Sequence, residues 1–317
     1  MRSRPAVSRR APPPPRSLPL RPPRQRQLWS PVLPQPQRYG RHIDRIGLGR
    51  TLAIGVVASA AILYAGWRAP EWLAPHVPQE WEERYGDTLV GDFGGKYCTG
   101  PGGQEALTKL ARRMSPGSAR MNLRVVDIDI VNAAALPGGN VVIFEELLSE
   151  ADGPDEVAGV LAHEIAHVER RHVTQAMIRE LGFGLVITAF GGNTGGSVNS
   201  VLAAGHSRGS ERQADSDAIA MLGRAGISPL ATAGFFERLA KQEARLGRIS
   251  EGLSYVSTHP MSAERQKNFR DSAVKGRTYT PALSRDEWEA LFNICRNDPE
   301  NVRKREEAAR EREEEAE

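Results

Sequence analysis

The segment His163-Glu164-Ile165-Ala166-His167 has the residue types and the spacing of a metal-dependent hydrolase. Two His four residues apart lie on one face of a helix, about one turn from each other, so both imidazoles can bind a single Zn²⁺. The intervening Glu164 can act as general base towards the attacking water. We therefore expect one zinc ion per chain, with His163 and His167 as ligands and Glu164 as a catalytic residue.

The motif is predicted to lie in the middle of a helix. The segment Gly153-Pro154-Asp155-Glu156 places a proline and two acids where the first turn of a helix favours them. Apolar residues then recur at helical spacing up to residue 168. This pattern predicts a helix that presents both His side chains to one site.

A zinc site needs a third protein ligand, and a second predicted helix downstream offers one. Glu211 and Asp215 are four residues apart in this helix, so they share one face. Glu211 can supply an oxygen ligand, while Asp215 can accept the free N–H of a metal-bound imidazole. An acid pair at this spacing is otherwise typical of a solvated helix face.

His259 precedes Pro260, which disfavours helical backbone at the His and places its imidazole in a loop. Two functional roles are open for it. It could donate to the oxyanion of a tetrahedral intermediate, or it could occupy the open metal position and silence the site. A surface histidine without function is the alternative.

Residues 132–143 have the pattern of an apolar strand end, a Pro-Gly-Gly turn and a second short strand. An exposed edge strand beside a metal could bind an extended polypeptide by strand addition. An ordinary hairpin is the alternative.

These four elements, in this order, resemble the zinc metallopeptidase family that contains HtpX and the CAAX prenyl endopeptidases, whose compact catalytic domains are called minigluzincins. The resemblance covers roughly residues 95–275 and is strongest to the single-anchor, Oma-type envelope peptidases. It implies a mostly helical α+β zincin with a small sheet, which hydrolyses peptide bonds of membrane or envelope proteins in protein quality control. A non-proteolytic chaperone or assembly factor on the same fold is the alternative, and the intact motif residues argue against it.

The resemblance also implies a role for each matching residue. The zinc ligands would be His163, His167 and Glu211. The base would be Glu164, with Asp215 behind a ligand and His259 lining the cleft. The residues expected to contact the polypeptide substrate are Asn132, Ala133, Ala135 and Arg265.

The first fifty residues are predicted to be a disordered, basic tail. They contain eleven Pro, twelve Arg and a single acid, Asp44, so they cannot bury a core. The net charge of the whole chain is only +3, which means that the folded part is not strongly basic. Nucleic-acid binding by the folded part is therefore not expected.

Residues 51–67 carry no charge and are predicted to be a transmembrane anchor that contacts lipid. The Arg-rich tail should stay on the cytoplasmic side, which leaves the rest of the chain on the other side. With the resemblance, this predicts a single-pass protein of the bacterial inner membrane with a periplasmic catalytic domain. A cleaved signal peptide is the competing interpretation of the apolar run. The mitochondrial inner membrane is the alternative location, because an Arg-rich, acid-poor start is typical of transit peptides.

Cys98 and Cys295 are the two cysteines, and they bracket the predicted catalytic domain. A disulfide is expected on the exported side, with two separate thiols as the alternative. The uncharged segment 181–205 is broken by glycines, so it could be a lid, a membrane-skimming segment or core.

The domain prediction is a tail at 1–50, the anchor at 51–67, a linker at 68–94, the metallopeptidase domain at 95–296 and a charged tail at 297–317.

Overall fold

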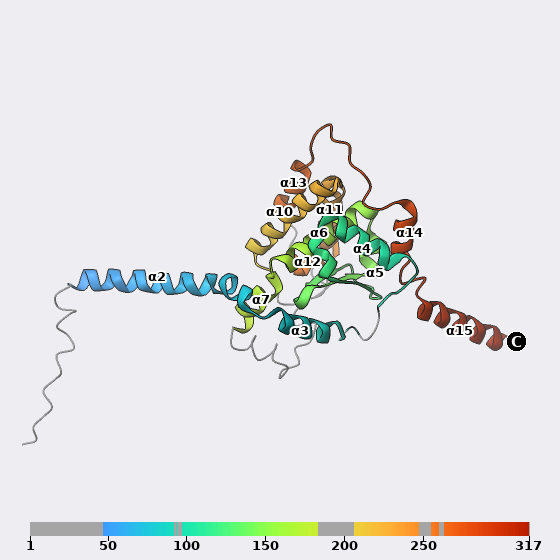
Figure 1. The fold of residues 1–317 in the computed structure, drawn as a ribbon, viewed down its shortest axis with the longest axis horizontal. Helices are drawn as coiled ribbons and strands as arrows, with labels where there is room; N and C mark the ends of the chain where they lie inside the picture. Colours follow the sequence, from blue (N-terminus) through green and yellow to red (C-terminus); the bar gives the residue numbers. More distant parts are fainter. Residues whose placement is uncertain are drawn as a thin grey trace, which may run out of the picture. The chain divides into compact units, whose positions relative to one another are not determined.

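The computed structural model describes residues 47–91, 93, 97–182, 206–246, 255–259 and 263–316 of the 317-residue chain. Most of the predicted N-terminal tail and nearly all of the uncharged segment 181–205 lie outside these residues. The described part is mostly helical and contains one three-stranded sheet (Figure 1). This confirms the predicted α+β class.

The predicted anchor forms helix α2, Leu48–Leu73, which extends beyond the expected 51–67 at both ends. The segment 49–76 has the length and hydropathy needed to cross a membrane, and its most apolar window is not buried against other parts of the protein. Large apolar side chains are exposed along its length, including those of Val56, Ile62, Leu63 and Trp67. Such a surface is suited to lipid rather than to water.

The sheet has the strand order β1-β3-β2, with β1 parallel and β2 antiparallel to β3. The strands are β1 (Asn122–Val126), β2 (Ala133–Leu136) and β3 (Asn140–Phe144). The predicted hairpin is therefore confirmed, and β2 lies at an edge of the sheet. Its turn, η3 (Pro137–Gly139), needs glycine at residue 138, where φ is 75° and a Cβ would lie 2.4 Å from Glu83 Cα.

Helices cover both faces of this sheet. Val125 and Ile143 face one core cluster, together with apolar residues of α4 (Gly103–Met114) and α6 (Pro154–Glu169). Val126 and Phe144 face a second cluster, with residues of α3 (Gln79–Gly91) and α7 (His172–Leu181). Strands buried on both faces need apolar residues throughout instead of alternating ones. This explains the run of four apolar residues, 141–144, in β3.

Residues 74–91 correct part of the predicted linker, because they form η1 (Ala74–His76) and α3 (Gln79–Gly91) and pack onto the sheet. Tyr85 and Leu89 are buried on one face of α3, and the carboxylate of Glu82 is paired with Arg171 at 2.7 Å. The first turns of α3 are mostly polar, so the helical spacing of its buried apolar residues is hard to recognise in the sequence. The part of the chain that packs around the sheet therefore includes α3.

The active-site motif lies on α6, which packs against β2 and β3 and also against α10 and α11 (Figure 1). Proline and glycine punctuation in the sequence also predicts helices over 229–246, 261–275 and 285–295. The first matches α11, whereas the other two are shorter in the structure. The remaining elements are α4 (Gly103–Met114), η2 (Pro116–Arg120), α5 (Glu145–Glu150), α6 (Pro154–Glu169), α7 (His172–Leu181), α10 (Arg208–Ala225), α11 (Pro229–Leu246), α12 (Tyr255–Thr258), α13 (Ala263–Asp271), α14 (Arg285–Phe292) and α15 (Pro299–Ala316).

Cys98 and Cys295 form a disulfide between chain positions 197 residues apart. The backbone beside it is paired as well, since Gly100 N–H donates to the carbonyl of Ile294 at 3.1 Å. The segment before α4 is thereby joined to the segment after α14. A closed loop of this length restricts the unfolded chain and so stabilises the folded state.

Helix α6 approaches α11 closely at Gly159. A Cβ built there would lie 1.9 Å from Thr232 Oγ1 and 2.6 Å from Thr232 Cβ, so even alanine does not fit. Gly234 in α11 has no neighbour within 4 Å of such a Cβ and offers a matched control.

We expect Gly159→Ala to lower the free energy of unfolding by about 1–3 kcal/mol, because the added methyl group overpacks the helix contact. Gly234→Ala should raise it by about 0.5–1 kcal/mol through helix propensity alone. Chemical denaturation of both variants and the wild type measures the difference. Equal stability of the two variants would contradict the close approach of α6 and α11.

Candidate metal centre

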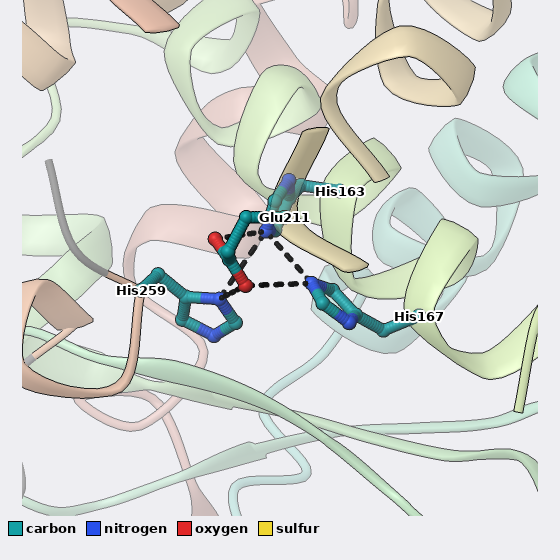
Figure 2. Close-up of side chains that lie close together, drawn as sticks. All are labelled: His163, His167, Glu211 and His259. Carbon is teal, nitrogen blue, oxygen red and sulfur yellow. Dashed lines mark hydrogen bonds and ion pairs between the residues drawn. The ribbon is translucent and has the colours of Figure 1, made fainter. Parts of the chain in front are cut away.

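Three separate segments bring His163, His167, Glu211 and His259 together in the interior (Figure 2). The two His of α6 are one turn apart, as predicted. Helix α10 is capped by Ser207, whose Oγ accepts a hydrogen bond from Ser210 N–H at 3.1 Å, and this places Glu211 in the first turn. His259 directly follows α12, where its N–H donates to the Tyr255 carbonyl at 2.8 Å. All four side chains are buried.

The ligand atoms of these residues lie within contact distance of one another. The Nε2 atoms of His163 and His167 are 2.9 Å apart, and His163 Nε2 is 3.4 Å from Glu211 Oε2. His167 Nε2 is 3.3 Å from Glu211 Oε1. His259 Nδ1 completes the group at 3.1 Å from Glu211 Oε1 and 3.2 Å from His163 Nε2.

These separations fit a tetrahedral metal site. Ligands bonded at about 2.0–2.1 Å to a tetrahedral zinc ion are separated by about 3.3 Å, close to the observed 2.9–3.4 Å. The Nδ1 atom of His163 lies 3.0 Å from Asp215 Oδ1, so its N–H donates there and its Nε2 presents a lone pair. A lone pair directed at a carboxylate requires a cation between the two. The donor set therefore suits a metal ion.

The electrostatics of the site lead to the same conclusion. Burial and Arg265 lower the pKa of His163, but Glu211 and Asp215 outweigh them and raise it to about 9. Burial opposes ionisation of Glu211, yet the neighbouring His259 and His163 hold the pKa of its carboxyl far below the usual range. The site therefore favours positive charge at His163, which a proton or a metal cation supplies.

Asp215 and Arg265 lie behind the ligands. Arg265 donates from Nε and Nη2 to Asp215 at 2.8 and 2.7 Å, and its Nη1 lies 3.1 Å from Glu211 Oε2. Only 4% of Arg265 is exposed. This corrects the prediction that Arg265 contacts substrate, because its guanidinium is buried against two carboxylates. Asp215 thus orients His163, and Arg265 orients Glu211.

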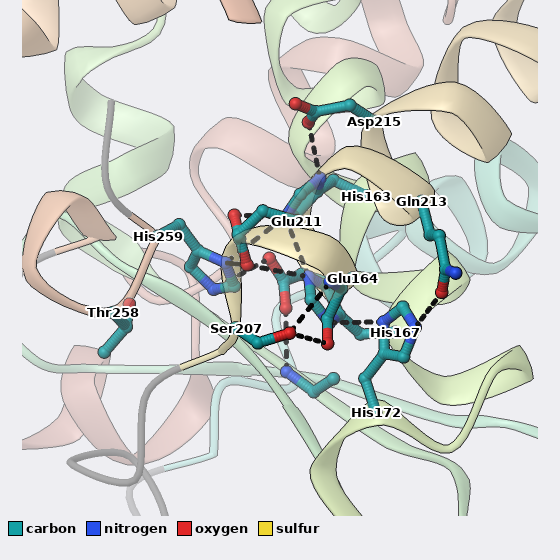
Figure 3. Close-up of polar contacts among 12 residues, drawn as sticks. His163, Glu164, His167, His172, Ser207, Glu211, Gln213, Asp215, Thr258 and His259 are labelled. Carbon is teal, nitrogen blue, oxygen red and sulfur yellow. Dashed lines mark hydrogen bonds and ion pairs between the residues drawn. The ribbon is translucent and has the colours of Figure 1, made fainter. Parts of the chain in front are cut away.

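Glu164 lies between the metal-binding group and the edge strand (Figure 3). Its Oε2 accepts a hydrogen bond from Ala135 N–H at 2.9 Å, which directs that N–H away from β3. Its Oε1 is buried without a hydrogen-bond partner among the described residues, 3.5 Å from His259 Nε2. Burial raises the pKa of the Glu164 carboxyl, as suits a group that exchanges a proton.

Three residues around the site were not predicted from the sequence. His172 Nδ1 lies 3.1 Å from His167 Nδ1, and His172 Nε2 lies 3.2 Å from Gln213 Oε1. The ring of His206 lies against that of His167, with centroids 3.8 Å apart and the planes tilted by 32°. Five of the seven His of the chain thus lie at this site. Because histidine is so rare in the sequence, each His outside the motifs was a candidate for the site, but motif spacing alone does not identify it.

Residues 103–273 match the family model of peptidase family M48. The chain belongs to this family. The match covers the described elements from α4 to α13, and with them all four residues of the metal-binding group. Membership in M48 agrees with the predicted relation to Oma-type metallopeptidases and implies a metal cofactor.

Curated relatives of the chain include a beta-barrel assembly-enhancing protease of Yersinia pestis, which is 32% identical over 54% of this chain and 38% of its own length. Two others are named mitochondrial metalloendopeptidase OMA1. The Arabidopsis thaliana protein is 34% identical over 47% of this chain and 31% of its own length, and the Saccharomyces cerevisiae protein is 33% identical over 44% and 42%. The chain thus spans less than half the length of these relatives.

Of the two roles considered for His259, the geometry favours occupation of the open metal position. Its Nδ1 lies at the fourth corner of the ligand group, which is the position that a closed site would use. We therefore expect His259→Ala to raise peptidase activity, by about tenfold if the closed arrangement is favoured about tenfold. Cleavage of unfolded casein and metal content should be measured together, with exposed His76→Ala as control. A fall of about 10²–10³-fold with unchanged metal content would instead assign an oxyanion donor.

Proposed function

We propose that the protein is a membrane-anchored zinc metalloendopeptidase that cleaves polypeptides of a membrane or envelope compartment, with His163, His167 and Glu211 as zinc ligands. The observation that carries this proposal is the position of Glu164. Its unpartnered Oε1 lies beside the ligand group, and its Oε2 is fixed to the edge strand by Ala135. A binding protein without hydrolytic activity has no need of such a carboxylate.

Zinc bound at this group would act as a Lewis acid towards the scissile carbonyl and the attacking water. Glu164 would take a proton from that water at Oε1 and transfer it to the leaving nitrogen. Ala135 N–H holds the other oxygen, so the carboxylate keeps its orientation through both transfers. Asp215 and Arg265 hold His163 and Glu211 in place.

The orientation of the backbone groups in edge strand β2 is evidence for a polypeptide substrate. Ala133 N–H donates to Asn132 Oδ1 at 2.8 Å and Ala135 N–H donates to Glu164, so both point away from β3. Within a strand the N–H and C=O of one residue point to the same side, so the carbonyls of Ala133 and Ala135 also face away from β3, where the N–H groups of an added strand could donate to them. We propose that Ala133 and Ala135 bind the substrate backbone and that Asn132 fixes the start of the strand.

The apolar helix and the disulfide support the location. Helix α2 has the composition of a membrane span, and a Cys98–Cys295 disulfide persists in an oxidising compartment. The eleven Arg before helix α2, with Arg50 in its first turn, favour a cytoplasmic N-terminus. We propose the periplasmic side of a bacterial inner membrane, with the mitochondrial inner membrane as the alternative. The work of the enzyme would be protein quality control, and the name of the Yersinia pestis relative supports an envelope role.

We expect Glu164→Gln to lower the turnover of unfolded casein by about 10²–10⁴-fold, because it removes the general base and spares the metal ligands. Metal content should stay at about one zinc per chain. Glu180→Gln, on the exposed face of α7, is the matched control and should leave turnover unchanged. A Glu164→Gln variant that hydrolyses casein at the wild-type rate would refute the proposed mechanism.

A further inference from the structure

His172 and Gln213 form a chain of side-chain contacts that ends on His167 (Figure 3). We propose that these two residues are positioning residues that fix the tautomer and the ring orientation of His167, so that its Nε2 is presented to the metal. This inference rests on the proposed role of His167 as a metal ligand. It assigns a function to two side chains that lie outside the predicted motifs.

The direction of each hydrogen bond follows from the ligand role. If His167 binds metal through Nε2, its proton must be on Nδ1, which lies 3.1 Å from His172 Nδ1. That N–H therefore donates to His172 Nδ1, so the proton of His172 is on Nε2. His172 Nε2–H then donates to Gln213 Oε1 at 3.2 Å. Each atom finds a partner of the correct kind only in this arrangement.

The other ligand on α6 is supported differently. His163 Nδ1 donates to the buried carboxylate of Asp215, which Arg265 holds in turn. For His167, the group that accepts from Nδ1–H is the neutral imidazole of His172 instead of a carboxylate. Hydrogen bonds of this kind to a ligating His orient its ring, and their loss commonly lowers metal affinity by about 10–100-fold.

The backbone beside His172 is held by the segment that follows the apolar helix. Arg171 has φ 55° and ψ 35°, a conformation that residues other than glycine rarely adopt. Its guanidinium is bound to Glu82 on α3 and donates to the Val77 carbonyl, each at 2.7 Å. These contacts keep the turn between α6 and α7 in shape. This turn places the His172 ring within hydrogen-bonding distance of His167.

The test compares zinc affinity of full-length variants in detergent, measured by competition with a chelator at fixed pH. We expect His172→Leu to lower affinity by about 10–100-fold, because His167 loses its acceptor. His172→Asn keeps an oxygen close to the position of Nδ1 and should recover most of that loss. The exposed His76→Leu carries the same substitution away from the site and should not change affinity.

Gln213 provides a second pair of variants, which protects the test against misfolding of the buried His172 variants. Its side chain is on the exposed face of α10, so substitution there spares the core. Gln213→Leu should weaken zinc binding by about tenfold, whereas Gln213→Glu keeps an acceptor and should not. Thermal unfolding of the metal-free variants checks that the fold is intact.

Wild-type zinc affinity in His172→Leu, or equal affinities of Gln213→Leu and Gln213→Glu, would overturn the proposed positioning role while leaving the ligand assignment standing. A wild-type chain with no measurable zinc affinity would overturn the proposed function itself. The two failures are therefore distinguishable.

Discussion

The convergence of four electron-pair donors in the interior is the constraint on which the rest of this structure depends. Imidazole nitrogens and carboxylate oxygens only 2.9–3.4 Å apart repel one another unless a cation lies between them. Burial strengthens both the repulsion and the attraction to a cation. The site is therefore stable only as a positively charged centre, and metal binding should contribute directly to the stability of the fold.

The surrounding elements can be understood as supports for this centre. Helix α6 lies between the sheet and α10, so the two His and Glu211 face each other across one helix contact. Asp215 and Arg265 orient His163, and His172 contacts His167 on its other nitrogen. In the proposed mechanism, the sheet edge beside Glu164 would place a polypeptide backbone next to the base. Chemistry and substrate docking thus depend on the same helix.

Much of this arrangement could be predicted from local spacing. The i,i+4 pairs His163/His167 and Glu211/Asp215 share helix faces whatever the tertiary structure is, and the Pro-Gly-Gly turn leaves little choice but a hairpin. The confirmed bounds of α11 follow from the same kind of local signal.

Features that depend on contacts between distant segments were not predictable in this way. The burial of α3 requires a partner surface on the sheet, and local spacing within residues 68–94 does not reveal that surface. The position of Arg265 beneath Asp215 and the approach of His172 to His167 are likewise set by packing. The side of the metal group that His259 occupies depends on a side-chain conformation that spacing does not determine.

X-ray absorption at the zinc edge of the purified full-length protein tests the central claim most directly, because it reports the ligands themselves. The structure predicts four nitrogen or oxygen neighbours at about 2.0–2.1 Å, with the scattering of three imidazoles, and no sulfur at about 2.3 Å. Replacing His259 by Ala should remove one imidazole from that signal. A spectrum with six oxygen neighbours, with sulfur, or with fewer than two imidazoles would contradict the metal centre described above.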